Sequence, residues 1–149
     1  MLVDGERFDL IELAFHLPSE HQVQSRVFDF EIQFSHANHR GERVIVAVLG
    51  RAGRKHGLTR NLWPMLPSYP GHIAKIIGFN PIHLLPRRKS YYRYSGSETI
   101  PPCRQGIRWM ILEEPIQISQ KQIGYLDRLI RGSARPLQPV FTRVPLRSR

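Results

Sequence analysis

The segment Val27-Phe-Asp-Phe-Glu-Ile-Gln-Phe-Ser-His36 specifies the fold more clearly than any other part of this sequence. Apolar and polar residues alternate along it, and residues two apart on a strand point to the same side. The alternation therefore predicts a strand. One side would carry Phe28, Phe30, Ile32 and Phe34, and the other side Asp29, Glu31, Gln33 and Ser35.

Further strands are predicted before and after this segment. Residues 8–16 form one candidate, and Pro18 ends it because proline cannot donate a hydrogen bond to a sheet. Residues 44–49 are continuously apolar, which is typical of a strand buried on both faces. Residues 107–112 form another candidate. The layout predicts a mainly β (α+β) protein.

One well-defined helix is predicted near the end of the chain. Ser119 is a candidate N-cap, with Gln122 at the spacing of a capping box. Gly132 supplies the stop. Between them, apolar residues recur at helical spacing: Ile123, Leu126, Leu129 and Ile130. A second, short helix is expected around residues 59–65.

The composition indicates a single basic globular domain. The chain has 149 residues, a hydrophobic fraction of 41% and a formal net charge of +10. Arginine accounts for 18 of the 22 basic residues, and its guanidinium group suits bidentate contact with carboxylate or phosphate. An acidic protein or a polyanion is therefore an expected partner, with an idle basic surface as an equal alternative.

The cysteine content and the hydropathy of the sequence bear on whether the protein is disulfide-bonded, membrane-spanning or exported. Cys103 is the only cysteine, so an internal disulfide is excluded. The sequence has no apolar run long enough for a membrane span, and residues 1–7 show no signal-peptide core. The compartment stays open.

Two stretches carry a resemblance to a known family. The first is Glu12-Leu-Ala-Phe-His-Leu-Pro-Ser-Glu-His21, followed by residues 28–36, and the second is Ser90-Tyr-Tyr-Arg-Tyr-Ser-Gly-Ser-Glu-Thr-Ile-Pro-Pro-Cys103, followed by Gly106-Ile-Arg-Trp109. Both resemble α-type carbonic anhydrases of the bacterial branch. The resemblance implies a single domain over residues 1–149 with that family's central twisted mixed sheet and a few peripheral helices.

The resemblance also implies an incomplete domain, because the family's opening segment has no counterpart here. A truncated gene model, a fragment completed by a partner and a domain rebuilt around a new interface are the three explanations. The family's cysteine at the position of Cys103 often pairs with one in that segment, so Cys103 is expected to be either free or bridged to another chain, and free and buried is the default. Family relatives of this type are often periplasmic or secreted.

The family holds zinc with three histidines, and the matching positions here are Ala14, His16 and Gln33. Alanine has no donor atom, and glutamine is a weak oxygen ligand for zinc. No cofactor is therefore favoured, with zinc bound only if the protein is active. Two arrangements remain for the side chains on this cavity floor. We favour a hydrogen-bonded polar cluster with water. The alternative is a divalent ion held by His16, Gln33, Glu12 and Glu31.

Residues that support the zinc site in the family remain in this sequence. Glu31 and Glu12 match second-shell positions, which orient ligand side chains. Glu20 and Thr99 match the pair that steers the zinc-bound hydroxide, so they are expected to be vestigial.

The carbon dioxide pocket of the family is altered at two of five matching positions. Ile45, Ile107 and Trp109 preserve its apolar character, whereas Ser35 and Glu98 do not. A carboxylate beside an apolar gas pocket favours water instead. An outward-turned Glu98 is the alternative.

These observations predict a carbonic-anhydrase-like protein that is catalytically inactive and serves as a binding or structural module. The alternative is a zinc-dependent carbonic anhydrase with weak activity, and a subunit of a larger assembly is a third reading. Nucleic acid is not expected, because Tyr91, Tyr92 and Tyr94 match the family's core. The expected surface contacts are Arg51, Arg54, Lys55, Arg60, Arg87, Arg88, Lys89 and Arg93.

Overall fold

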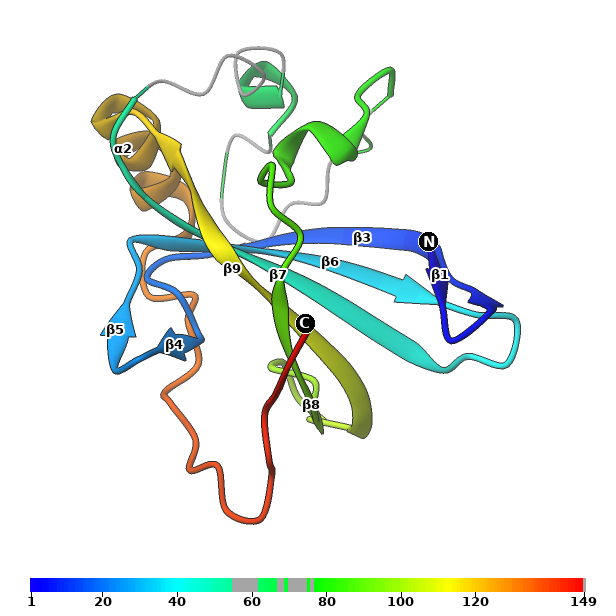
Figure 1. The fold of residues 1–149 in the computed structure, drawn as a ribbon. Helices are drawn as coiled ribbons and strands as arrows, with labels where there is room; N and C mark the ends of the chain where they lie inside the picture. The colour runs from blue at the N-terminus through cyan, green and yellow to red at the C-terminus, as the bar shows by residue number, and fades with distance from the viewer. Residues whose placement is uncertain (55–61, 67–68, 70–74, 76, 149) are drawn as a thin grey trace.

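A computed structural model describes residues 1–54, 62–66, 69, 75 and 77–148. Its main feature is a six-stranded, strongly twisted sheet with the order β10-β8-β9-β7-β6-β3 (Figure 1). β7 and β9 are parallel, and every other neighbouring pair is antiparallel. The sheet is therefore mixed, as the resemblance implied. Its strands are β3 (Asp9–His16), β6 (Phe30–Ala37), β7 (Arg43–Ala52), β8 (Tyr91–Ser97), β9 (Gln105–Ile118) and β10 (Leu146–Arg147).

Two small hairpins and short helical turns accompany the sheet. The hairpins pair β1 (Leu2–Val3) with β2 (Glu6–Arg7), and β4 (Gln22–Val23) with β5 (Arg26–Val27). The 3-10 turns are η1 (Trp63–Met65) and η2 (Pro81–Leu84). The helix expected around residues 59–65 is met only by η1, and residues 59–61 lie outside the described residues.

The segment of alternating residues forms β6, but the strand starts at Phe30 and not at Val27. Gln24 and Ser25 have positive φ angles of 52° and 61° and turn the chain into the β4–β5 hairpin. The Phe28 amide then donates to Ser19 Oγ (2.9 Å), and its ring packs against a different cluster from that of Phe30. The prediction that Phe28 and Phe30 share a side is therefore wrong, because the hairpin interrupts the alternation.

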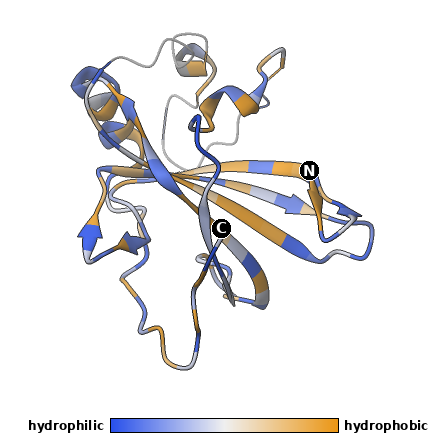
Figure 2. Cartoon of the chain, in the orientation of Figure 1, coloured by the Kyte–Doolittle hydropathy of each residue, from blue (hydrophilic) through white to orange (hydrophobic). Residues whose placement is uncertain are grey.

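The sheet has an apolar cluster on each face. Phe30, Ile32 and Phe34 of β6 pack on the face covered by the helix α2 (Gln120–Ile130). The opposite face carries the second cluster, which includes Ile45, Ala47, Leu49, Ile107, Trp109 and Ile111. β7 contributes to both clusters, and Figure 2 shows hydrophobic residues along most of its length. The prediction that residues 44–49 are buried on both faces is confirmed.

Helix α2 has the predicted ends. The Gln122 amide N–H donates to Ser119 Oγ (3.3 Å), and the Ser119 amide N–H donates to Gln122 Oε1 (2.9 Å), which completes the capping box. Gly132 has a φ of +72°, a conformation that glycine adopts without strain. No helix in the described part of the chain is long and apolar enough to span a membrane.

Candidate functional site

The candidate site lies on the sheet face that carries the odd-numbered residues of β6. The register places His16 of β3 beside Glu31, and Ala14 beside Gln33. Residues paired across neighbouring strands share a face. The three positions that match the family's ligands, Ala14, His16 and Gln33, are therefore neighbours.

Glu31 is the centre of a buried hydrogen-bond network. Its Oε2 accepts the backbone N–H groups of Glu20 (3.0 Å) and His21 (2.9 Å). Its Oε1 accepts from Nδ1 of His21 (2.8 Å) and from the Gln33 amide (2.9 Å). Burial raises the pKa of the Glu31 carboxyl, but the charge and the hydrogen bonds of His21 lower that pKa by more, so it lies below the usual value. The network holds Glu31 as a buried carboxylate.

Gln33 donates both of its amide hydrogens within this network. One goes to Oε2 of Glu20 (2.8 Å) and the other to Oε1 of Glu31 (2.9 Å). The other oxygen of Glu20 accepts the backbone N–H of Arg135 (2.8 Å). Since two buried carboxylates repel each other, the bridging amide stabilises both of them.

His21 connects this network to the aromatic residues of the sheet. Its Nε2 lies 2.7 Å from the Tyr94 hydroxyl, which donates to it when the ring proton is on Nδ1. Burial raises the pKa of Tyr94, and the charge of Glu31 raises it further. The Tyr94 ring stacks on Trp109, whose Nε1 donates to the Ser97 carbonyl (3.1 Å). Both ring nitrogens of His21 are therefore hydrogen-bonded in the fold.

His16 presents an unpartnered nitrogen. Its Nδ1 lies 3.3 Å from the carbonyl oxygen of Ser133 and 3.3 Å from Oε1 of Glu20. Among the described residues, its Nε2 is the one buried side-chain nitrogen or oxygen without a hydrogen-bond partner. A buried polar atom without a partner costs free energy, which a bound molecule that donates to Nε2 would offset.

The side chains present do not fit the family's zinc ion. Zinc in proteins takes three or more nitrogen, sulfur or carboxylate donors. Ala14 supplies none, and Gln33 gives both amide hydrogens to carboxylates. Within the described ranges, no group of three or more His, Cys, Asp and Glu side chains is placed to hold a metal. His16 remains as a single imidazole.

Glu12 and Thr99 lie outside the buried network. Glu12 is opposite Ser35 in the register, but its side chain is exposed. Thr99 lines the same pocket as Glu20, whose carboxylate accepts its hydrogen bonds from Gln33 and Arg135. The supporting role of Glu12 and the vestigial pairing of Glu20 with Thr99 stay predictions.

Four of the five residues that match the carbon dioxide pocket lie on the same sheet face, and Glu98 follows the end of β8. Ile45 pairs with Ser35 and with Trp109, and Ile107 packs in the same apolar cluster. Glu98 is not turned outward, because its side chain is 16% exposed and pairs with Arg43 at 3.2 Å. The salt bridge supplies this largely buried carboxylate with a counter-charge.

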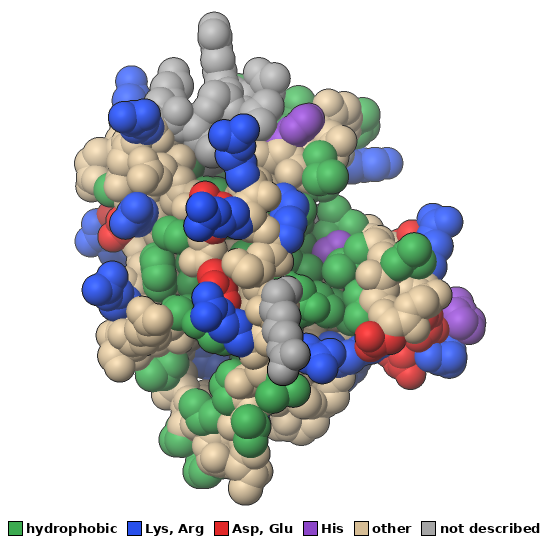
Figure 3. All heavy atoms as spheres, viewed as in Figure 1, with side chains coloured by type: hydrophobic (Ala, Val, Ile, Leu, Met, Phe, Trp, Pro, Cys, Tyr) green, Lys and Arg blue, Asp and Glu red, His purple; other side chains and the backbone are tan. Residues whose placement is uncertain are grey.

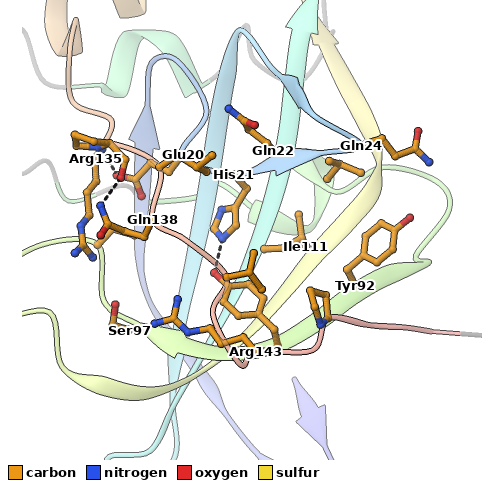
Figure 4. A pocket seen from close by; sticks show the side chains of 17 residues that line it. Glu20, His21, Gln22, Gln24, Tyr92, Ser97, Ile111, Arg135, Gln138 and Arg143 are labelled. Atoms are coloured by element: carbon orange, nitrogen blue, oxygen red, sulfur yellow. Dashed lines mark hydrogen bonds between the residues drawn. The ribbon is translucent and has the colours of Figure 1, made fainter.

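Sequence reasoning missed a pocket beneath the segment that follows α2 (Figure 4). Its volume is about 360 Å³. Residues 135–145 run past the β4–β5 hairpin toward β8, and we call the cavity that they enclose the strap pocket. No periodicity or spacing in this segment indicated a site. The residues of this pocket that bear on its chemistry are Glu20, Tyr92, Tyr94, Ile111, Arg135 and Arg143.

The described basic residues expected to contact a partner are all on the surface. They are Arg51, Arg54, Arg87, Arg88, Lys89 and Arg93. Lys55 and Arg60 lie outside the described residues. Basic side chains spread over the face seen in Figure 3, where the largest group of acidic side chains lies at the right and smaller ones lie at the centre and left.

Cys103 differs from expectation. It is free within the described part of the chain, but it is partly exposed and not buried. It lies in a turn in which its N–H donates to the Ile100 carbonyl (3.0 Å), and this places the residue at the surface.

Together, the twisted mixed sheet and the buried polar network on one of its faces define a protein of the α-carbonic anhydrase fold. Residues 2–145 match the family described as eukaryotic-type carbonic anhydrase. The chain is 34% identical to a carbonic anhydrase of Neisseria gonorrhoeae over 145 residues, which is 97% of this chain and 58% of that protein.

Solved structures agree with this match. The α-carbonic anhydrase of Thermovibrio ammonificans, in complex with the inhibitor sulfanilamide, superposes with a TM-score of 0.90 at 35% identity, over 97% of this chain and 65% of that one. Dioscorin complexed with ascorbate superposes with a TM-score of 0.86 at 30% identity, over 97% of this chain and 64% of that one.

The chain belongs to the carbonic anhydrase family. It spans somewhat more than half the length of the curated carbonic anhydrase of Neisseria gonorrhoeae that it matches.

Proposed function

We propose that this chain is a binding module of the carbonic anhydrase family that works without the family's zinc ion. The observation that carries the proposal is the Gln33 amide, which bridges Glu20 and Glu31 at a position where the family has a metal ligand. Ala14 removes a second ligand, so one imidazole is left.

A relative supports a binding role for this fold. Dioscorin has been solved in complex with ascorbate, and it is 30% identical to this chain. The unpartnered Nε2 of His16 and the strap pocket offer places in this chain where a small molecule can be held.

The second candidate is a zinc-dependent carbonic anhydrase that hydrates carbon dioxide. The comparisons taken alone favour this candidate over the binding role, because the matched family and the bacterial relatives carry the enzyme's name. His16 supports it too, since its free Nε2 is the kind of donor that zinc takes. The missing donors at Ala14 and Gln33 count against it.

Zinc content and activity separate the two candidates. The chain is expressed with added zinc, dialysed, and measured by elemental analysis and by stopped-flow carbon dioxide hydration. We expect substoichiometric zinc and no hydration above the uncatalysed rate. Stoichiometric zinc with turnover that sulfanilamide inhibits would establish the second candidate instead.

The double variant Ala14→His/Gln33→His is the matched control, because it supplies three imidazoles on adjacent strands. We expect it to retain more zinc than the wild type after dialysis. The single variant Ala14→His keeps the Gln33 bridge and should retain little. Equal zinc in the wild type and the double variant would show that Ala14 and Gln33 do not decide metal binding.

A further inference from the structure

The strap pocket combines an apolar wall with two arginine side chains. Ile111 of β9 and Tyr92 of β8 form part of its floor, and Leu137 of the strap segment covers it. Its volume of about 360 Å³ lies within the range of pockets that take small organic molecules. Most of the lining is apolar, so the pocket suits a ligand with an apolar body.

Among the described residues, the guanidinium groups of the arginines at this pocket have no carboxylate partner. Arg143 is partly buried, and within the described residues its guanidinium forms no ion pair or hydrogen bond. Arg135 donates from Nη1 to the Glu98 carbonyl at 3.5 Å, which is a weak contact. In Figure 4 both guanidinium groups lie on the same side of the pocket as Ser97. A partly buried cation without a counter-charge favours the arrival of an anion.

The one acidic side chain in the pocket wall does not supply that counter-charge. Glu20 already accepts from the Gln33 amide and from the backbone N–H of Arg135. Each oxygen of the Glu20 carboxylate thus already accepts a hydrogen bond within the buried network. Glu20 therefore does not serve as the ion-pair partner of Arg143. The hydroxyl groups of Ser97 and Thr99 add neutral hydrogen-bonding partners to the lining.

We propose that the strap pocket binds a small carboxylic acid with an apolar body. The carboxylate pairs with Arg143, whose fork of N–H donors matches the two oxygens, and the body packs among Tyr92, Ile111 and Leu137. This inference rests on the binding role proposed above and names its ligand class.

Benzoate and its neutral analogue benzyl alcohol test the proposal on protein treated with EDTA. Binding is measured by isothermal titration calorimetry, with circular dichroism as a check of folding. We expect benzoate to bind and benzyl alcohol to bind far more weakly. In Arg143→Gln the affinity for benzoate should fall about 10-fold or more, the usual loss for a hydrogen bond to a charged group.

Two further variants complete the experiment. Arg104→Gln removes an exposed arginine that does not line the pocket, and it should bind benzoate like the wild type. Leu137→Ser removes apolar wall from an exposed position, so it weakens benzoate binding without threatening the fold. Failure of benzoate to bind, equal binding of benzyl alcohol, or unchanged affinity in folded Arg143→Gln would overturn the proposal.

The result is separable from the zinc experiment. Benzoate binding that survives EDTA and depends on Arg143 supports the strap pocket even if the chain proves to carry zinc. If the chain is free of zinc and does not bind benzoate, the proposed binding role is retained, and the proposal of a carboxylic acid ligand is overturned.

Discussion

At the scale of single residues, the main finding is the exchange of a metal ligand for a hydrogen-bonding bridge. An imidazole at position 33 would face a positive ion, whereas the Gln33 amide faces two carboxylates. Glu20 and Glu31 keep their buried positions because this neutral donor satisfies one oxygen of each. The buried carboxylates therefore remain, and a hydrogen-bonding amide takes the place of a metal ligand between them.

This bridge makes Gln33→Leu a direct test. The substitution keeps approximate size but removes the Gln33 donor to Oε2 of Glu20, and it leaves Oε1 of Glu31 with His21 in place of two donors. We expect the free energy of unfolding to fall by about 2–4 kcal/mol in urea denaturation at neutral pH.

The matched control is Gln138→Leu, which removes an exposed amide that donates to the Pro136 carbonyl, a neighbour two residues away. It should change stability by less than about 0.5 kcal/mol. Equal stabilities of the wild type and Gln33→Leu would mean that the bridge does not stabilise the carboxylate pair.

At the scale of elements, β3 differs from the other long strands because it is the outer strand of the described sheet. One of its edges pairs with β6, and Leu10 and Ile11 on it are exposed. An exposed apolar edge strand is a template for pairing with another chain. The irregular register between Leu10 and Glu12 reduces this tendency without removing it.

We therefore predict that the isolated chain self-associates through β3 and that Ile11→Lys reduces this association. A charge on an edge strand opposes pairing with a second edge. Sedimentation velocity at several protein concentrations measures the effect.

Ile82→Lys is the control, since Ile82 is equally apolar and exposed but lies in the short turn η2. It should leave the association of the wild type unchanged. A wild type that stays monomeric at every concentration would contradict both this prediction and the idea of a subunit within a larger assembly.

At the scale of the whole molecule, the net charge of +10 is unevenly neutralised. Some exposed arginines have acidic partners: Arg7 pairs with Asp9, Arg40 with Glu6, and Arg131 with Asp127. By contrast, Arg87, Arg88 and Lys89 are exposed and form no ion pair within the described part of the chain. Unpaired basic side chains dominate the field that an approaching anion meets.

We predict that a sulfated oligosaccharide binds this protein and that added salt weakens the complex, because salt screens exposed charges. The triple variant Arg87→Gln/Arg88→Gln/Lys89→Gln should lower the affinity roughly 3- to 30-fold, as expected for the loss of a few exposed charge contacts. Fluorescence anisotropy of a labelled oligosaccharide measures the affinity.

The triple variant Arg7→Gln/Arg40→Gln/Arg131→Gln loses the same formal charge from positions that are already paired, and it should have a smaller effect. Equal losses in the two variants would show that net charge alone governs binding. A complex that does not respond to salt would contradict an electrostatic contact.

Local patterns in the sequence determined four strands of the main sheet (β3, β6, β7 and β9), the capped helix and, through the resemblance, the family. These features follow from short-range rules, since alternation and capping depend on residues a few positions apart. The substitutions at Ala14 and Gln33 were likewise visible in the sequence. Only the tertiary structure decided that Gln33 bridges two carboxylates, that Glu98 pairs with Arg43, and that a strap closes over an arginine-bearing pocket. Such contacts join residues distant in the chain, and no local pattern encodes which of them meet.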